Sequence, residues 1–108
     1  MANVYLNSKL DLVNTSDTVL YTVPSNSRSI VKSILVSEDA GSGTTINLTL
    51  TNATGAVFSI FKLKAVGANT TIQLLTEPLV LLESEILKVQ AADANELHVI
   101  ATILEINR

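Results

Sequence analysis

The apolar residues of this chain fall in short runs separated by turn-forming residues, and this spacing is what most constrains its fold. Residues 18–39 show the pattern, because two runs rich in Val, Ile, Leu, Tyr and Thr flank the cluster Pro-Ser-Asn-Ser at 24–27. Two such runs around a turn cluster predict a β-hairpin or a corner between strands. No stretch keeps apolar residues at helical spacing over the length of a typical helix, so the chain is predicted to be all-β.

The predicted strands form a two-sheet antiparallel β-sandwich with about eight strands. Jelly-roll and immunoglobulin-like arrangements both fit, and the absence of Cys and Trp favours the jelly roll. A length of 108 residues predicts one domain, residues 1–108, with a possible N-terminal arm at 1–13. The segments of strand character are 3–13, 19–23, 29–37, 44–51, 57–63, 70–75, 79–82, 86–91 and 96–106.

The alternation of side chains predicts which face of each strand is buried. Segment 44–51 alternates cleanly between apolar and polar residues, which predicts one buried and one solvated face. In segment 57–63 the apolar residues change parity, and we favour a β-bulge near Phe61 over burial of both faces. Segment 29–37 is apolar on both parities, which predicts cover on both faces. The buried set predicted in 44–51 is Ile46, Leu48 and Leu50.

The last strand carries more apolar residues than one core can accept. Its odd-numbered residues 97–103 suit the core, while the opposite parity is too apolar for open solvent. A terminal strand near residues 4–6 can complete a neighbour's sheet edge as easily as its own. We therefore expect an oligomer, although a loop of the same chain covering this face is an alternative. The predicted oligomer or capsid interface comprises Val4, Leu6, Ile100, Leu104 and Ile106.

The charge and hydropathy of the chain argue against nucleic acids and membranes as partners. The net charge is −3, the pI is near 4.9, and the 7 Lys and Arg residues are scattered. The longest apolar runs, such as 79–82, are too short to span a bilayer. Residues 1–6 lack the features of a signal peptide, so a soluble protein made in a cytoplasm is expected.

The residues that could carry catalysis are sparse. His98 is the single histidine, it lies in mid-strand, and no G-x-S-x-G motif accompanies it. The acidic pairs Glu38 with Asp39 and Glu83 with Glu85 lie in turn clusters, where solvated carboxylates are the usual case. The sequence therefore predicts a protein that is not an enzyme and has no catalytic residues.

Cation and cofactor sites are also unsupported. The turns at 93–96 and 38–39 offer oxygen ligands for Ca²⁺, but neither matches an EF-hand, and Asx turns at strand ends are the simpler interpretation. Only four aromatic residues are present, which provides no stacking platform for sugars or bases. We predict no metal and no cofactor.

Two consecutive strand motifs resemble a family of viral proteins. The sequence LYTVP at 20–24 is followed by SIVKSILV at 29–36, and the later segments 78–81, 86–91 and 97–101 fit the same pattern. In these features the chain resembles small β-sandwich virion structural proteins of tailed bacteriophages. The matching residues set strands and turns, and none is catalytic or ligand-binding.

The resemblance implies that the protein is a building block of a phage virion. A capsid decoration (cement) protein on the outer head surface is the main expectation, acting as a homotrimer that contacts the major capsid protein or another virion protein. The alternative is a tail, neck or fibre-tip module that binds a virion protein or a host receptor. An enzyme such as a depolymerase domain belongs to a different class and finds no support in the motifs. The resemblance implies synthesis in the host cytoplasm.

Overall fold

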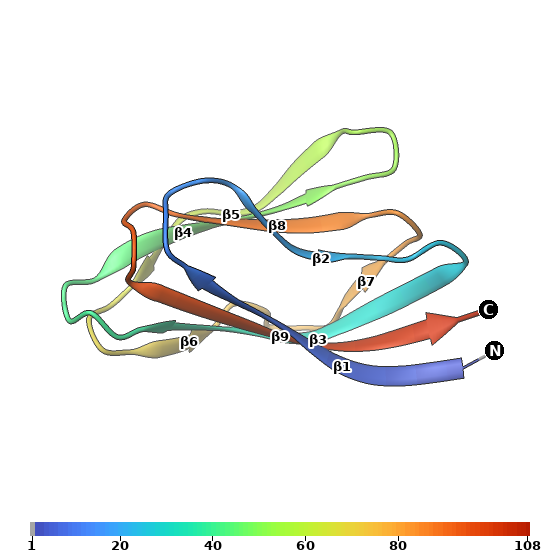
Figure 1. Ribbon diagram of the computed structural model, residues 1–108, viewed down its shortest axis with the longest axis horizontal. Coiled ribbons are helices and arrows are strands. Elements are labelled where there is room, and N and C mark those ends of the chain that lie inside the picture. The colour runs from blue at the N-terminus through green and yellow to red at the C-terminus, as the bar shows by residue number, and fades with distance from the viewer. Residues whose placement is uncertain (1) are drawn as a thin grey trace.

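The protein consists of two antiparallel β-sheets packed face to face (Figure 1). The computed structural model describes residues 2–108. That range has no helix long and apolar enough to cross a membrane. The strands are β1 (Ala2–Leu12), β2 (Thr18–Thr22), β3 (Ser27–Glu38), β4 (Thr44–Thr51), β5 (Val57–Val66), β6 (Thr71–Gln73), β7 (Leu79–Leu81), β8 (Ile86–Ala91) and β9 (Leu97–Asn107).

The strand order is that of a jelly roll. Sheet A has the order β1-β9-β3-β6, with β7 also paired to β3, and sheet B has the order β2-β8-β4-β5. If β6 and β7 are counted as one interrupted strand, each sheet has four strands, and the chain crosses repeatedly between the sheets. The predicted all-β, jelly-roll-like sandwich is therefore confirmed.

The ninth strand arises because one strand is interrupted. β6 pairs with residues 35–37 of β3, and β7 pairs with residues 29–31. Between them the chain leaves the edge of β3, and Gln73 Oε1 accepts hydrogen bonds from the backbone N–H groups of Ile34 (2.8 Å) and Leu75 (3.2 Å). A side-chain amide thus takes a hydrogen bond from β3 where strand pairing stops.

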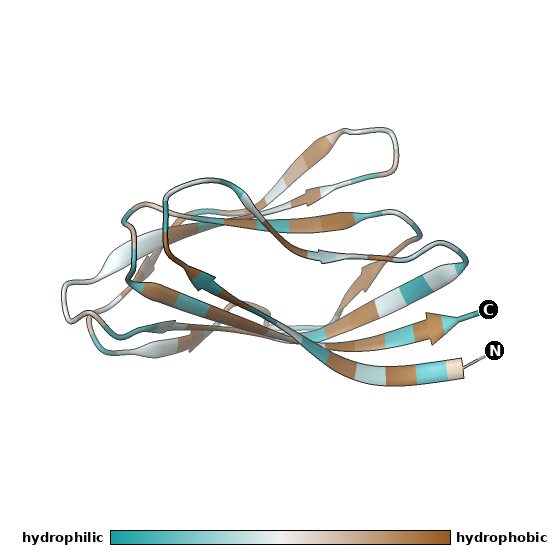
Figure 2. Cartoon of the chain, viewed as in Figure 1, coloured by the Kyte–Doolittle hydropathy of each residue, from teal (hydrophilic) through white to brown (hydrophobic). Residues whose placement is uncertain are grey.

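The core is built from the inward-facing residues of both sheets. In β9, Leu97, Val99, Ala101 and Ile103 are fully buried, as their alternation predicted. In β4, Ile46 and Leu48 are fully buried and Leu50 is partly buried against the same core. Figure 2 shows the alternating hydrophobic and hydrophilic bands along β1 and β9 that this packing requires. Burial of these side chains is the main favourable contribution to folding.

Two bulges decide which residues face the core. β5 shifts register against β4 on both sides of the pair between Leu48 and Phe61, which confirms the predicted bulge near Phe61. β3 shifts register against β9 between Val31 and Ser33. Because of this second shift, Val31, Ile34 and Val36 share the buried face, whereas Ile30 and Leu35 lie on the other face, for which the sequence also predicts cover. That outer face is not covered by any other part of residues 2–108, and Leu35 is 40% exposed.

A charge at position 48 tests the assignment of faces in β4. Leu48 is fully buried, so Leu48→Asp should lower the free energy of unfolding by about 4 kcal/mol. Thr49 lies on the outer face of sheet B opposite Lys88, and Thr49→Asp should cost less than about 1 kcal/mol. Urea denaturation of both variants measures the difference. Equal losses would mean that the faces of β4 are wrongly assigned.

Candidate interaction surface

The outer face of sheet A carries a row of apolar side chains that crosses all four strand positions. The strand register places Tyr5 of β1 beside Leu104 of β9, Leu104 beside Ile30 of β3, and Ile30 beside Val80 of β7. Tyr5 is 70% exposed and Val80 is 59% exposed, while the two central residues are partly exposed. Cross-strand neighbours of this kind form a continuous surface.

Further apolar residues lie on the same face, and the polar pair Asn7 and Thr102 separates Ile100 from the row. Ile100 lies beside Leu35, with 43% and 40% of their surfaces exposed, and Ile106 lies beside Arg28 on the other side of the row. The apolar outer face of sheet A is therefore defined as Tyr5, Ile30, Leu35, Val80, Ile100, Leu104 and Ile106. An exposed apolar surface that spans a whole sheet is a common mark of a protein contact.

The structure divides the interface residues expected from the sequence between two faces. Ile100, Leu104 and Ile106 lie together on the apolar outer face. Val4 and Leu6 do not join them, because β1 pairs Val4 with Glu105 and Leu6 with Ile103, whose side chains point to the inner face. Leu6 packs against the core, and Val4 is 42% exposed at the open end of that inner side. The five residues therefore do not form a single patch, and their part in an interface stays a prediction.

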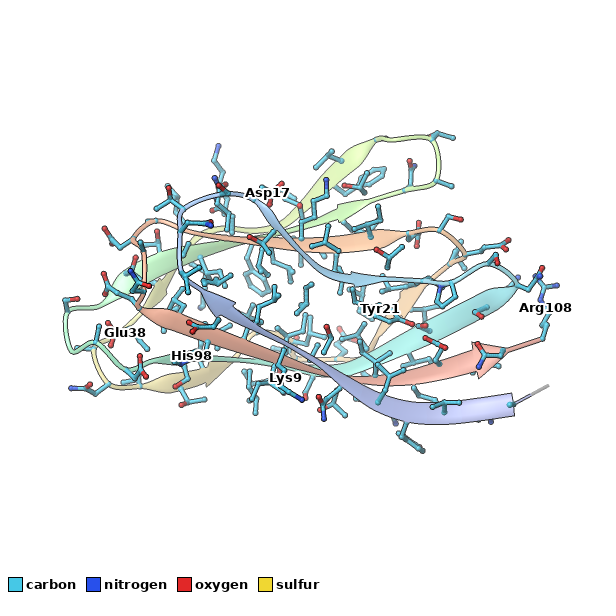
Figure 3. The ribbon with its side chains drawn as sticks, viewed as in Figure 1. Lys9, Asp17, Tyr21, Glu38, His98 and Arg108 are labelled. Carbon is cyan, nitrogen blue, oxygen red and sulfur yellow. The ribbon has the colours of Figure 1, made fainter. Side chains whose placement is uncertain are left out.

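One end of the outer face is polar. The imidazole of His98 lies between two carboxylates, with Nε2 at 3.2 Å from Asp11 Oδ1 and Nδ1 at 3.5 Å from Asp39 Oδ2. His98 and Lys9 lie along the outer side of sheet A, whereas Tyr21 lies between the sheets (Figure 3). Within residues 2–108, no hydroxyl group is hydrogen bonded to His98 in the manner of a serine nucleophile and its base.

Glu38 is a buried carboxylate enclosed by backbone donors. Its Oε1 accepts hydrogen bonds from the N–H groups of Asn69 (2.9 Å) and Gly41 (3.0 Å), and its Oε2 accepts them from Gly43 (3.0 Å) and Ser42 (3.3 Å). Gly41 and Gly43 have φ of 86° and 74°, which lets the loop turn these donors towards the carboxylate. The hydrogen bonds, above all that from Asn69, outweigh burial and lower the pKa of Glu38 from 4.5 to about 2.

The other candidate carboxylates also hold the fold together. Glu83 accepts a hydrogen bond from the N–H of Asn26, and Glu85 Oε1 accepts one from the N–H of Leu82 at 2.8 Å. In the turn at 93–96, where Asx turns are the simpler interpretation, Asp93 accepts from the hydroxyl of Thr44 at 2.7 Å. Across the described part of the chain, no three His, Asp or Glu residues are grouped so that they could hold a metal ion.

Tyr21 forms a polar connection between the two sheets. Its side chain extends from β2 in sheet B, and its hydroxyl donates to Glu105 Oε2 of β9 at 2.6 Å and lies 2.7 Å from Ser29 Oγ of β3. Burial, together with the hydrogen bond and negative charge of Glu105, raises the pKa of Tyr21 to about 12. The phenol therefore stays neutral and keeps its donor role at ordinary pH.

Sequence reasoning missed four members of the apolar outer face. Tyr5 has the opposite parity to Val4 and Leu6 and was overlooked for that reason, although its position next to them carried the signal. The outward orientation of Ile30 and Leu35 could not be predicted because of the bulge in β3, which no Gly or Pro in the sequence indicates. Val80 sits in the middle of a short apolar run whose sides the sequence does not distinguish.

Comparisons with known proteins support the fold. No protein family and no curated protein matches the sequence. One chain from the acidic stable capsid structure of Helicobacter pylori bacteriophage KHP30 is similar, with a TM-score of 0.57 and 10% identity over 100% of this chain and 95% of that chain. A chain of the virus-like particle of the extra small virus of the prawn Macrobrachium rosenbergii has a TM-score of 0.47 and 12% identity, over 99% and 79%. The first likeness shows a shared fold, and the second is too remote to add to it.

The carboxylate of Glu38 gives a testable pH dependence. Because its folded pKa of about 2 lies below the ordinary value of 4.5, the ionised group stabilises the fold above pH 4.5, and this contribution is lost as the pH falls towards 2. Glu38→Gln should therefore be less stable than the wild type at neutral pH, and the difference should shrink between pH 4.5 and 2. Urea denaturation over this range measures it. A constant difference would show that the charge of Glu38 contributes nothing.

Proposed function

We propose that this protein is a non-enzymatic structural component of a bacteriophage virion, and that it serves as a decoration (cement) protein on the outer surface of the head. The observation that carries the proposal is the apolar outer face of sheet A, which suits contact with another protein. Among the carboxylates that could have served catalysis, Glu38, Glu83 and Glu85 instead accept hydrogen bonds from the backbone of the domain itself. The fold shared with a chain of the KHP30 capsid structure supports the same role. A cement protein acts by burying surface between subunits, which stabilises the assembled state.

The two outer faces of the sandwich differ in a way that fits a layer on a shell. The outer face of sheet B carries mainly polar residues, Asn47, Thr49, Thr51, Lys88 and Gln90, with Val19 and Val57 exposed beside them. The outer face of sheet A carries seven apolar residues, several of them exposed in the isolated chain, with Lys9 and Thr102 among them. The outer face of sheet A is therefore the more apolar of the two and the better suited to contact with protein. In this proposal the partners are other copies of the chain, as a homotrimer, and the major capsid protein.

A second candidate function rests on the hairpin of β4 and β5. The turn of this hairpin and the start of β5 project from the rest of the sandwich (Figure 1), while β4 stays paired with β8 as far as Thr51. It presents Val57 and Phe58 with 63% and 54% of their surfaces exposed. A projecting apolar tip suits a tail, neck or fibre-tip module that inserts between neighbouring proteins or contacts a receptor. The number of copies per virion separates the two roles, because hundreds of copies indicate decoration and a few to some tens indicate the tail.

A charge in the apolar outer face should abolish assembly without unfolding the domain. Ile100 is 43% exposed, so Ile100→Glu should leave the circular dichroism spectrum of the subunit unchanged. In an assembly the same charge is removed from water with only the ammonium group of Lys9 beside it, and we expect binding to phage heads lacking this protein to fall at least about tenfold. Thr49→Glu, on the outer face of sheet B, is the matched control and should bind normally.

Co-sedimentation of each purified variant with such heads measures the effect. The proposal would be overturned if Ile100→Glu decorated heads as the wild type does, or if the wild type did not bind them at all. Loss of binding by both variants would show that the outer face of sheet B also takes part in the contact, against the proposed division between the two faces.

A further inference from the structure

Three of the four outer strand positions carry features that hinder pairing with another chain. β5 is bulged and carries Lys62 and Lys64. β2 has a register shift against β8 and is followed by Pro24. β6 and β7 have three residues each, and Pro78 precedes β7. Bulges, lysines, prolines and short strands are the usual means by which proteins keep sheet edges from associating.

The fourth edge, β1, lacks these features. It has 11 residues, pairs with β9 in an unbroken register from Ala2 to Leu12, and contains no Pro, no Gly and a single lysine. Its other side pairs with no strand of residues 2–108. A long, regular edge with free N–H and C=O groups is a template for a further strand. We propose that this strand is β1 of a second copy, paired antiparallel about a two-fold axis at Asn7.

The sequence of β1 is complementary to itself in that register. An antiparallel pairing that uses all 11 residues must centre on Asn7, whereas centring on Leu10 to join Lys9 with Asp11 would overlap only residues 8–12. In the full register no two like charges lie opposite each other. The facing pairs are Ala2 with Leu12, Asn3 with Asp11, Val4 with Leu10, Tyr5 with Lys9, Leu6 with Ser8, and Asn7 with its own copy.

This pairing explains two exposed side chains. Val4 is 42% exposed on the inner side of sheet A, and it gains Leu10 of the second copy as a neighbour. Tyr5 is 70% exposed on the outer side, and it gains the ammonium group of Lys9 against its ring. Sheet A then runs continuously through both copies, and their apolar outer faces meet along one surface. The pairing does not depend on the decoration role; in a trimer held by the outer face, it would link one trimer to the next.

Cross-linking tests the axis directly. The chain has no Cys, so Asn7→Cys introduces the sole thiol. Opposite residues of an antiparallel pair have Cα atoms about 4.5–5.5 Å apart, within reach of a disulfide. We expect Asn7→Cys to form a covalent dimer on mild oxidation, seen on a non-reducing gel. Thr102→Cys is the matched control, because Thr102 lies beside Asn7 one strand further in, about 14 Å from its own copy.

Opposite charges at the same position test the pairing without a covalent bond. Asn7 is exposed, and its amide oxygen accepts only from Lys9 Nζ at 2.9 Å, so Asn7→Asp and Asn7→Lys should fold normally. Each should raise the dimer dissociation constant about tenfold by placing like charges across the axis. An equimolar mixture should restore association as a heterodimer, which native mass spectrometry identifies by mass.

Three results would overturn the proposal. The first is that Asn7→Cys cross-links no faster than Thr102→Cys. The second is that the mixture of Asn7→Asp and Asn7→Lys associates no better than either variant alone. If Thr102→Lys abolishes association while Asn7→Lys leaves it intact, the copies meet through the apolar outer face instead of the β1 edge. The contact with the head and the contact between β1 strands can be tested separately. They are independent if Ile100→Glu loses head binding while Asn7→Cys still cross-links.

Discussion

The backbone hydrogen bonds that β9 forms with a strand on each side are the interaction on which the rest of the structure depends. β9 pairs with β1 along one side and with β3 along the other, so it lies inside sheet A and joins the two longest remaining strands. Its buried residues are the alternate positions Leu97, Val99, Ala101 and Ile103, and they form part of the inner face against which sheet B packs. Because side chains in a strand alternate, fixing this set inward also fixes Ile100, Leu104 and Ile106 outward.

The polar contacts at the two ends of the sandwich complement this apolar centre. At one end Glu38 gathers the loop after β3 and the loop after β5 around a single carboxylate. Towards the other end Tyr21 joins β2 to Glu105 and Ser29 of sheet A. A chain without cysteine has no covalent bond to hold its sheets together. Buried groups with all their hydrogen bonds made give these ends a defined geometry instead.

Much of the fold could be predicted from the sequence, because local alternation and turn residues carry most of the information for a sandwich. The buried sets of β4, β8 and β9 follow directly from parity, and the irregular pattern around Phe61 indicates a bulge. The buried and outer faces of β3 could not be told apart from its sequence, because its bulge leaves no local mark. The placement of Leu6 was missed because it depends on register with a strand almost a hundred residues later.

The candidate surface was predicted only in part for the same reason. The alternation within β9 is enough to predict Ile100, Leu104 and Ile106. The other members, Tyr5, Ile30 and Val80, come to lie beside them only through pairing between strands. The set of backbone donors around Glu38 could not be predicted from the sequence either, because the strongest donor, Asn69, lies 31 residues further along the chain. Sequence patterns describe single strands well, whereas a surface or a hydrogen-bonded site is formed by residues from several segments of the chain.

The central position of β9 also has a consequence for biosynthesis. The chain is made from its N-terminus, so the strand that joins β1 to β3 leaves the ribosome after every other strand (Figure 1). Until then, β1 and β3 have no strand between them, and sheet A is limited to the pairs that β3 forms with β6 and β7. Sheet A can therefore be completed only after β9 has been synthesised, which delays the burial of the inner faces of β1 and β3.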